Sequence, residues 1–188
     1  IETPEFISNE LMGQLARSFT SDQVLIFLIP LTSGLRVSEL LALTPDDIKG
    51  RTLKIRWPKS GRPVEYAVIP ESVESILAGY IKNREIPGDQ RIFDISRQGA
   101  GNIVARRAKI CGLAISIHYL RKWCATFWNR LDEHGMEAFV LRHSSVGLRD
   151  RYVAPLSLDE AAKKQDQHMS AYFQKGGELC LSGNLYRE

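Results

Sequence analysis

The chain has 188 residues, of which 44% are hydrophobic and 25% are charged, and its formal net charge at pH 7 is +3. This length and apolar content suit a single domain with its own core. The longest apolar run, residues 24–31, is far shorter than the roughly 20 residues that cross a bilayer, and no secretory pattern opens the chain. We therefore expect an intracellular protein with no membrane partner.

The three cysteines, Cys111, Cys124 and Cys180, are odd in number and far apart in the sequence. This pattern indicates neither a disulfide framework nor a zinc knuckle, so we expect reduced thiols and no metal site. The sequence also lacks a Gly-rich phosphate loop and a His-Glu-x-x-His pair, and we expect no cofactor.

Basic residues are concentrated in the middle of the chain. Residues 51–130 carry 15 Lys and Arg against 6 Asp and Glu, whereas residues 1–50 carry 3 against 7. A concentrated positive region suits a phosphate backbone, because each neutralised phosphate releases counterions. On charge alone, a solvated helical face explains the pattern equally well.

The first part of the chain predicts two helices and a short third one. Ser8 is suited to cap a helix that ends at about Arg17, and residues 21–31 form a second, apolar helix. Gly34 then makes a turn, and Arg36 stands at the start of the short helix.

A β-hairpin with a basic tip is predicted next. Asp46 and Asp47 are expected to cap the turn that precedes it. Residues 52–57 and 63–69 have strand-like composition, and the stretch between them, which includes Lys59, is rich in turn formers.

The rest of the chain is mainly helical in pattern. The expected helices cover residues 71–84, 99–111, 117–133 and 136–142, a short segment that holds Tyr152, and residues 158–173 after a capping box at Ser157 and Glu160. Residues 175–188 are expected to form a tail. The predicted fold class is therefore α+β, mainly α-helical, with a small antiparallel β-hairpin or sheet.

Six residues are candidates for a functional site: Arg36, Lys59, His118, Arg121, His143 and Tyr152. Each of them alone has an ordinary structural explanation. His118 and Arg121 are three residues apart and therefore share one helix face. His143 and Tyr152 are nine residues apart and would point in opposite directions on an unbroken helix, at about 100° per residue, so we expect a break at residues 144–147.

Together these motifs resemble the catalytic domain of the tyrosine recombinases, or phage-type integrases, over residues 8–155. The first arginine motif of that family resembles SGLRVSEL at residues 33–40, and its hairpin lysine resembles Lys59. Its His-x-Leu-Arg box resembles HYLR at residues 118–121, and its last box resembles LRHSS at residues 141–145, with Tyr152 beyond it.

Three positions depart from the family pattern. Ser33 stands where Thr is usual, Arg142 replaces a Gly, and residues 148–151 replace a Thr-rich stretch. None of these changes removes a catalytic group, but they leave the subfamily open.

The resemblance implies DNA cleavage and rejoining through a 3′-phosphotyrosine intermediate. Arg36 and Arg121 would hold the non-bridging oxygens of a phosphate with planar, bidentate hydrogen bonds. Tyr152 would be the nucleophile. His143 would hydrogen-bond the phosphate. Because the phosphotyrosine ester conserves the energy of the broken bond, rejoining needs neither ATP nor a metal.

Proton transfer in that reaction would involve two further groups. His118 is our candidate for the general base that helps the phenol lose its proton. Lys59 is our candidate for the general acid that protonates the departing 5′ oxygen. Lys54 lies on the same hairpin and stays open as an alternative.

The implied partner is double-stranded DNA. The protein would be a homotetramer on paired DNA sites and a monomer or dimer without DNA. The residues that we expect to contact DNA are Arg62, Arg106, Arg107, Lys109, Lys122, Arg142 and Arg149. Residues 1–174 would form the catalytic domain, and we expect the family's N-terminal DNA-binding domain to be absent. The helix over residues 158–173 either docks on a neighbouring protomer or packs within its own chain.

Two other functions remain open on the sequence. A type IB topoisomerase or telomere resolvase uses the same chemistry, although the His-x-x-Arg box favours a recombinase. A DNA-binding regulator without catalysis is the second, and the presence of all six groups argues against it. The sequence leaves open whether the role is viral genome integration, plasmid resolution or chromosome dimer resolution.

Overall fold

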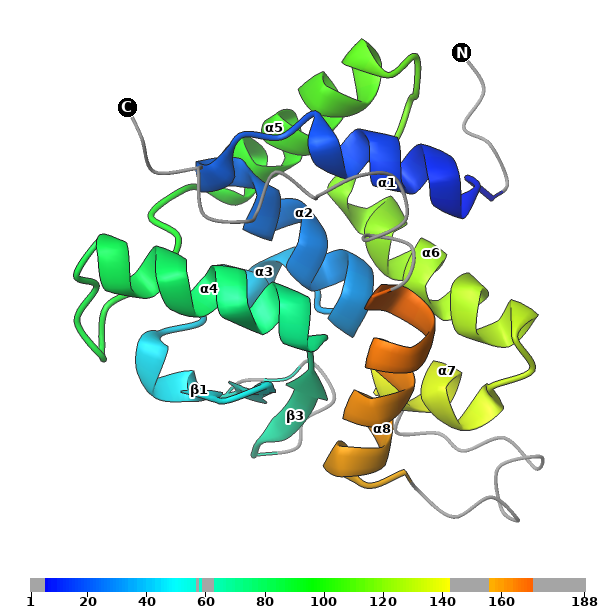
Figure 1. The fold of residues 1–188 in the computed structure, drawn as a ribbon. Helices are drawn as coiled ribbons and strands as arrows, with labels where there is room; N and C mark the ends of the chain where they lie inside the picture. Colours follow the sequence, from blue (N-terminus) through cyan, green and yellow to red (C-terminus); the bar gives the residue numbers. More distant parts are fainter. Residues whose placement is uncertain (1–5, 57, 59–62, 143–155, 171–188) are drawn as a thin grey trace.

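The computed structural model describes residues 6–56, 58, 63–142 and 156–170 (Figure 1). The expected break at residues 144–147, the helix of Tyr152 and the tail at residues 175–188 lie outside these ranges. Within them, no helix is both long and apolar enough to cross a membrane.

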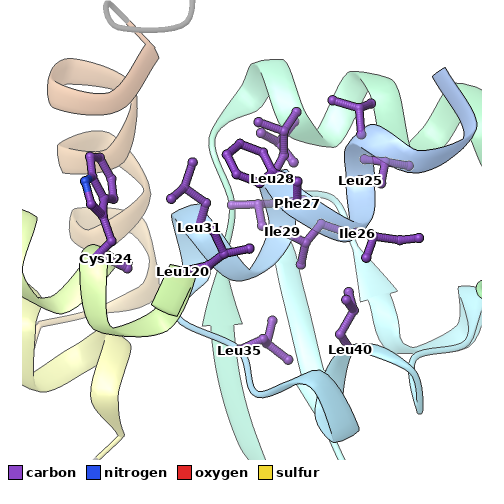
Figure 2. Close-up of a cluster of buried hydrophobic side chains, with 14 of the residues drawn as sticks. Leu25, Ile26, Phe27, Leu28, Ile29, Leu31, Leu35, Leu40, Leu120 and Cys124 are labelled. Carbon is purple, nitrogen blue, oxygen red and sulfur yellow. The ribbon is translucent and has the colours of Figure 1, made fainter. Parts of the chain in front are cut away.

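The core is built around helix α2 (Ser21–Ser33), which is buried on all sides from Val24 to Ser33. A helix without a polar face has to be covered by others, and α2 packs against α4 (Glu71–Asn83), α5 (Arg97–Ile110) and α6 (Ile117–Arg130). Figure 2 shows apolar side chains of α2 meeting Leu120 of α6 and Leu35 and Leu40 beyond the end of α2. The helix ends at Gly34, whose φ of 66° is left-handed.

Helix α1 (Asn9–Arg17) begins where the sequence predicts, because the Ser8 side chain accepts a hydrogen bond from the Leu11 N–H. The residues before it are attached to α6. The Ile7 N–H donates to the Tyr119 hydroxyl at 3.1 Å, and the Trp123 indole N–H donates to the Ile7 carbonyl at 2.7 Å.

The predicted hairpin is part of a three-stranded antiparallel sheet in the order β1 (Ile48–Lys49), β2 (Thr52–Ile55), β3 (Glu65–Val68). The short β1 is not predicted by the sequence. In the β2–β3 register Leu53 faces Ala67 and Ile55 faces Glu65. Before the sheet, Asp47 caps the 3-10 helix η1 (Pro45–Asp47) as expected, since its carboxylate accepts from the Thr44 N–H at 3.1 Å.

Several helix ends differ from the sequence prediction. Helix α2 ends at Ser33 instead of residue 31, and the helix predicted from residue 136 begins at His134. Helix α5 begins at Arg97, because Ser96 accepts from the Gly99 N–H and caps it there. Helix α6 ends at Arg130 instead of near residue 133, because Asp132 takes a left-handed φ of 57° and the Glu133 N–H closes the end on the Trp128 carbonyl. Helix α7 (His134–Leu141) follows directly.

Helix α8 (Leu158–Gln165) starts at the predicted capping box, in which Ser157 and Glu160 exchange hydrogen bonds, and continues into the π-helical turn η3 (Asp166–Ser170). It runs between the sheet and α7 (Figure 1) and packs within its own chain. Buried Gln165 donates to the Thr32 and Val68 carbonyls, both at 2.9 Å. This helix therefore joins α2 to β3, and the observed fold is the predicted mainly helical α+β class.

Gln165→Leu is expected to lower the free energy of unfolding by about 2 kcal/mol or more, because two buried carbonyl oxygens lose their donor. Gln167→Leu on the exposed side of the same turn is the matched control and should change it by less than about 0.5 kcal/mol. Urea unfolding measures both. Equal losses would mean that the Gln165 hydrogen bonds do not hold α8 in place.

Candidate functional site

A pocket of about 820 Å³ opens where the start of helix α3 (Val37–Leu40) meets the starts of α5 and α6. It is lined by Leu35, Arg36, Val37, Ser38, Arg97, Gln98, Ile117, His118 and Arg121. Three sequence candidates, Arg36, His118 and Arg121, therefore come together from parts of the chain more than 80 residues apart. Arg97 also lines the pocket and has no sequence motif that marks it.

Arg36 is the N-cap residue of α3 and is held by Glu39. Its backbone N–H donates to Glu39 Oε2 and its guanidinium donates to Glu39 Oε1, both at 2.8 Å. The Arg36 side chain is 31% exposed, whereas that of Glu39 is 4% exposed. Glu39 thus fixes a guanidinium that still faces the pocket. The sequence analysis did not single out Glu39, because Arg36 is not one of the Ser or Thr residues that open a capping-box pattern.

Arg121 is buried and links three elements. Its guanidinium donates to the Gly34 carbonyl, at the turn between α2 and α3, and to the Leu141 carbonyl at 2.6 Å, at the end of α7. Burial lowers the pKa of Arg121 to about 10, and the nearby charges of Arg142 and Arg36 act in the same direction. The group nevertheless stays protonated at neutral pH, so the pocket keeps this positive charge.

His118 stands one helical turn before Arg121 on α6 and is exposed at the mouth of the pocket. The sequence predicts a shared face for these two residues, and both line the same pocket. Their catalytic roles stay predictions.

The other three catalytic candidates, Lys59, His143 and Tyr152, lie outside the described residues. Lys54 is described, and it is exposed on β2. It lines a second hollow, of about 220 Å³, together with Ser38 and Glu39. The choice between Lys54 and Lys59 as general acid therefore stays open.

The expected DNA contacts lie in different surroundings. Arg106, Lys109 and Lys122 are exposed, and the last two line a hollow of about 560 Å³ that also includes His118. Arg107 instead turns its guanidinium to the Gln23 side chain, at 3.1 and 3.3 Å. Arg62 and Arg149 lie outside the described residues.

Arg142 was also expected to contact DNA, but in the structure its side chain points inward. Its side chain is only 5% exposed and forms ion pairs with Glu39 at 2.5 Å and Glu65 at 3.2 Å. A guanidinium that contacts DNA has to reach the surface, so this burial does not fit a phosphate contact. No sequence motif marks this pairing, because Glu39 and Glu65 are 103 and 77 residues away from Arg142.

The described charges around the pocket favour an anion. Three arginines, Arg36, Arg97 and Arg121, are among the described residues that line the pocket, and none of these lining residues is an Asp or Glu. Guanidinium groups held at fixed positions bind phosphate oxygens well, because little reorganisation is needed. Among the residues that the structure describes, no group of three or more His, Cys, Asp and Glu side chains could hold a metal ion.

Several solved recombinase and integrase structures share this fold. The integrase from mycobacterium phage Brujita matches with a TM-score of 0.67 at 17% sequence identity, over 89% of this chain and 58% of the integrase. XerA recombinase matches with a TM-score of 0.65 at 19% identity, over 90% of this chain and 66% of the recombinase. The Tn1549 transposon integrase, in complex with transposon right end DNA, matches with a TM-score of 0.63 at 18% identity, over 91% of this chain and 68% of the integrase.

No protein-family model and no curated protein sequence matches the chain. The chain spans less than two thirds of the Brujita integrase and of XerA recombinase. At these identities the likeness concerns the fold, and it confirms the tyrosine recombinase catalytic fold that the sequence motifs predict.

Gly34→Ala is expected to lower the free energy of unfolding by about 2–4 kcal/mol, because left-handed strain of about 1–2 kcal/mol adds to an overpacking cost. A Cβ at Gly34 would lie 2.7 Å from the Val140 carbonyl oxygen. The matched control is Gly50→Ala, whose φ of 55° is also left-handed but which has no neighbour within 4 Å. Urea unfolding should show the larger loss for Gly34→Ala. Equal losses would show that the approach of Gly34 to α7 is not close.

Proposed function

We propose that this chain, which has the tyrosine recombinase fold, is the catalytic domain of a site-specific DNA recombinase or integrase. The observation that supports this best is the pocket in which Arg36, His118 and Arg121 meet. These residue types suit phosphodiester exchange, and they come from two of the sequence motifs that resemble the family, at residues 33–40 and 118–121.

In the proposed reaction the two arginines hold one DNA phosphate. Arg36 keeps one edge on Glu39, and Arg121 is fixed by two backbone carbonyls, so neither guanidinium has to reorganise when the phosphate binds. Each guanidinium carries further N–H groups that are suited to the non-bridging oxygens. Positive charge fixed in this way stabilises the negative charge that builds up around phosphorus in the transition state.

The Tyr152 phenol is the proposed nucleophile. Its oxygen forms a bond to phosphorus while the bond from phosphorus to the 5′ oxygen breaks, and its proton passes to His118. The departing 5′ oxygen takes a proton from Lys59, or from Lys54 as the alternative. A 5′ hydroxyl of another strand then attacks the phosphotyrosine ester and releases Tyr152, so strand exchange uses no ATP and no metal.

The proposed partner is double-stranded DNA, inside the cell. We propose that it binds across the face that carries Arg106, Lys109 and Lys122. These exposed side chains lie on α5 and α6 next to the pocket. A duplex held by them could place one of its phosphates in the pocket. We further propose that exchange takes place between two paired sites in a tetramer. The biological setting, viral genome integration included, stays open.

Tyr152→Phe should abolish a covalent protein–DNA adduct on a nicked suicide duplex, because the variant has no oxygen to attack phosphorus. Denaturing gels detect the adduct. Tyr66→Phe, on the exposed face of β3, is the matched control and should leave it unchanged. An adduct that survives Tyr152→Phe would sink the assignment of the nucleophile, and Tyr172 would be tested next. Relaxation of any supercoiled plasmid without exchange between matched sites would favour a type IB topoisomerase.

A further inference from the structure

We infer that Arg142 is a positioning residue whose buried guanidinium orients Glu39, and through it Arg36, while tying the base of the β2–β3 hairpin to the end of α7. The inference rests on the proposed function, because it assigns Arg142 to the same cleavage reaction. Arg142 does not line the pocket and therefore acts through its neighbours.

The backbone of Arg142 is unusual for an arginine. The residue is the C-cap of α7 with a left-handed φ of 49°, a conformation that costs a non-glycine residue roughly 1–2 kcal/mol. Its N–H donates to the Ala138 carbonyl at 3.0 Å and completes the helix end. A glycine would serve this position without strain, so the backbone gives no reason for an arginine here.

The side chain of Arg142 supplies the reason. The terminal nitrogen donates to Glu39 Oε2 at 2.5 Å, and Nε lies 3.2 Å from Glu65 Oε2. All three side chains are 5% exposed or less. Burial lowers the pKa of Arg142, and the two carboxylates oppose that shift. For stability alone, such a buried ion cluster has no advantage over apolar packing, so orientation of the carboxylates is its specific effect.

Glu39 is the link between Arg142 and the pocket. Its Oε2 accepts from Arg142 and from the Arg36 N–H, and its Oε1 accepts from the Arg36 guanidinium. With Oε2 held from inside, the plane of the carboxylate is set and Oε1 is presented to Arg36 in one orientation. A loss of Arg142 would free the carboxylate to rotate and Arg36 to follow it.

Glu65 is the link to the hairpin. It is the first residue of β3 and lies opposite Ile55, the last residue of β2, so it stands at the base from which residues 56–64 extend. The hairpin tip includes Lys59 in the sequence, and His143 is the next residue after Arg142. One guanidinium therefore joins the segments that carry three of the candidate catalytic groups. Lysine is a poor replacement, because its donors sit on one compact nitrogen and lack the planar fork that reaches Glu39 through a terminal nitrogen and Glu65 through Nε.

The test compares Arg142→Lys with Arg51→Lys as the matched control. Arg51 is also an arginine with several partners, since it donates to the Ile69 and Ala162 carbonyls and pairs with Asp166. None of these partners lines the pocket or contacts Arg36. The readouts are the single-turnover rate of adduct formation on a nicked duplex at saturating DNA, the Kd for that duplex and the thermal midpoint.

We expect Arg142→Lys to slow adduct formation by roughly 10- to 100-fold, because misplacing a reacting group by about 1 Å costs about this much. The Kd should change by less than about twofold, since the inference places the buried Arg142 side chain away from the DNA. Arg51→Lys should lower the thermal midpoint without slowing the reaction at a temperature where both variants are folded. An equal rate for the two variants would overturn the inference, and so would a loss confined to Kd, which would make Arg142 a phosphate contact after all.

A second variant keeps the inference testable if Arg142→Lys does not fold. Glu65→Met, which has no oxygen acceptor, removes the hairpin link and leaves the Arg142–Glu39 pair in place, and it should slow adduct formation by about 10-fold. An unchanged rate for this variant would contradict the hairpin link. A wild-type chain that forms no adduct would refute the proposed function instead. The coupling of Arg142 to Glu65 would then be measured from the free energies of urea unfolding in a double-mutant cycle. Additive effects of the two substitutions would refute the contact itself.

Discussion

The interaction on which the site depends is the double hydrogen bond of Arg121 to the Gly34 and Leu141 carbonyls. It fastens α6 to the turn between α2 and α3 and to the end of α7. Together with the packing of α2 on α6, it sets the position of Arg36 relative to His118. The end of α7 also approaches Gly34 closely, and a Cβ there would meet the Val140 carbonyl oxygen.

A second constraint is the burial of charge. Arg121, Arg142, Glu39 and Glu65 are all buried at one junction of helices and sheet. Taking such groups out of water costs free energy that stability alone does not justify. What the junction gains is order, because Arg121, Glu39 and Arg142 are held by directed hydrogen bonds and Glu65 by an ion pair to Arg142. A reaction that needs two guanidinium groups at defined places around one phosphate makes use of that order.

Much of the fold follows from local sequence signals. Ser8 and Ser157 predict the starts of α1 and α8, and the pattern of residues 52–69 predicts the hairpin, because capping and alternation are short-range effects. The meeting of Arg36 with His118 and Arg121 was predicted only through the family resemblance. The inward turn of Arg142 was missed, since its partner Glu65 is set by tertiary packing. The end of α6 was missed because Asp132 adopts a left-handed backbone conformation, which aspartate tolerates but does not require.

The attachment of Ile7 to α6 has a mechanical consequence. Both hydrogen bonds of Ile7 end on side chains of that helix, at Tyr119 and Trp123, and these two residues flank Arg121 along the chain. A pull on the polypeptide at residue 7 would thus load α6 directly, without first passing through α1. Tension at residue 7 would therefore act on the same part of α6 that positions Arg121, the proposed phosphate ligand.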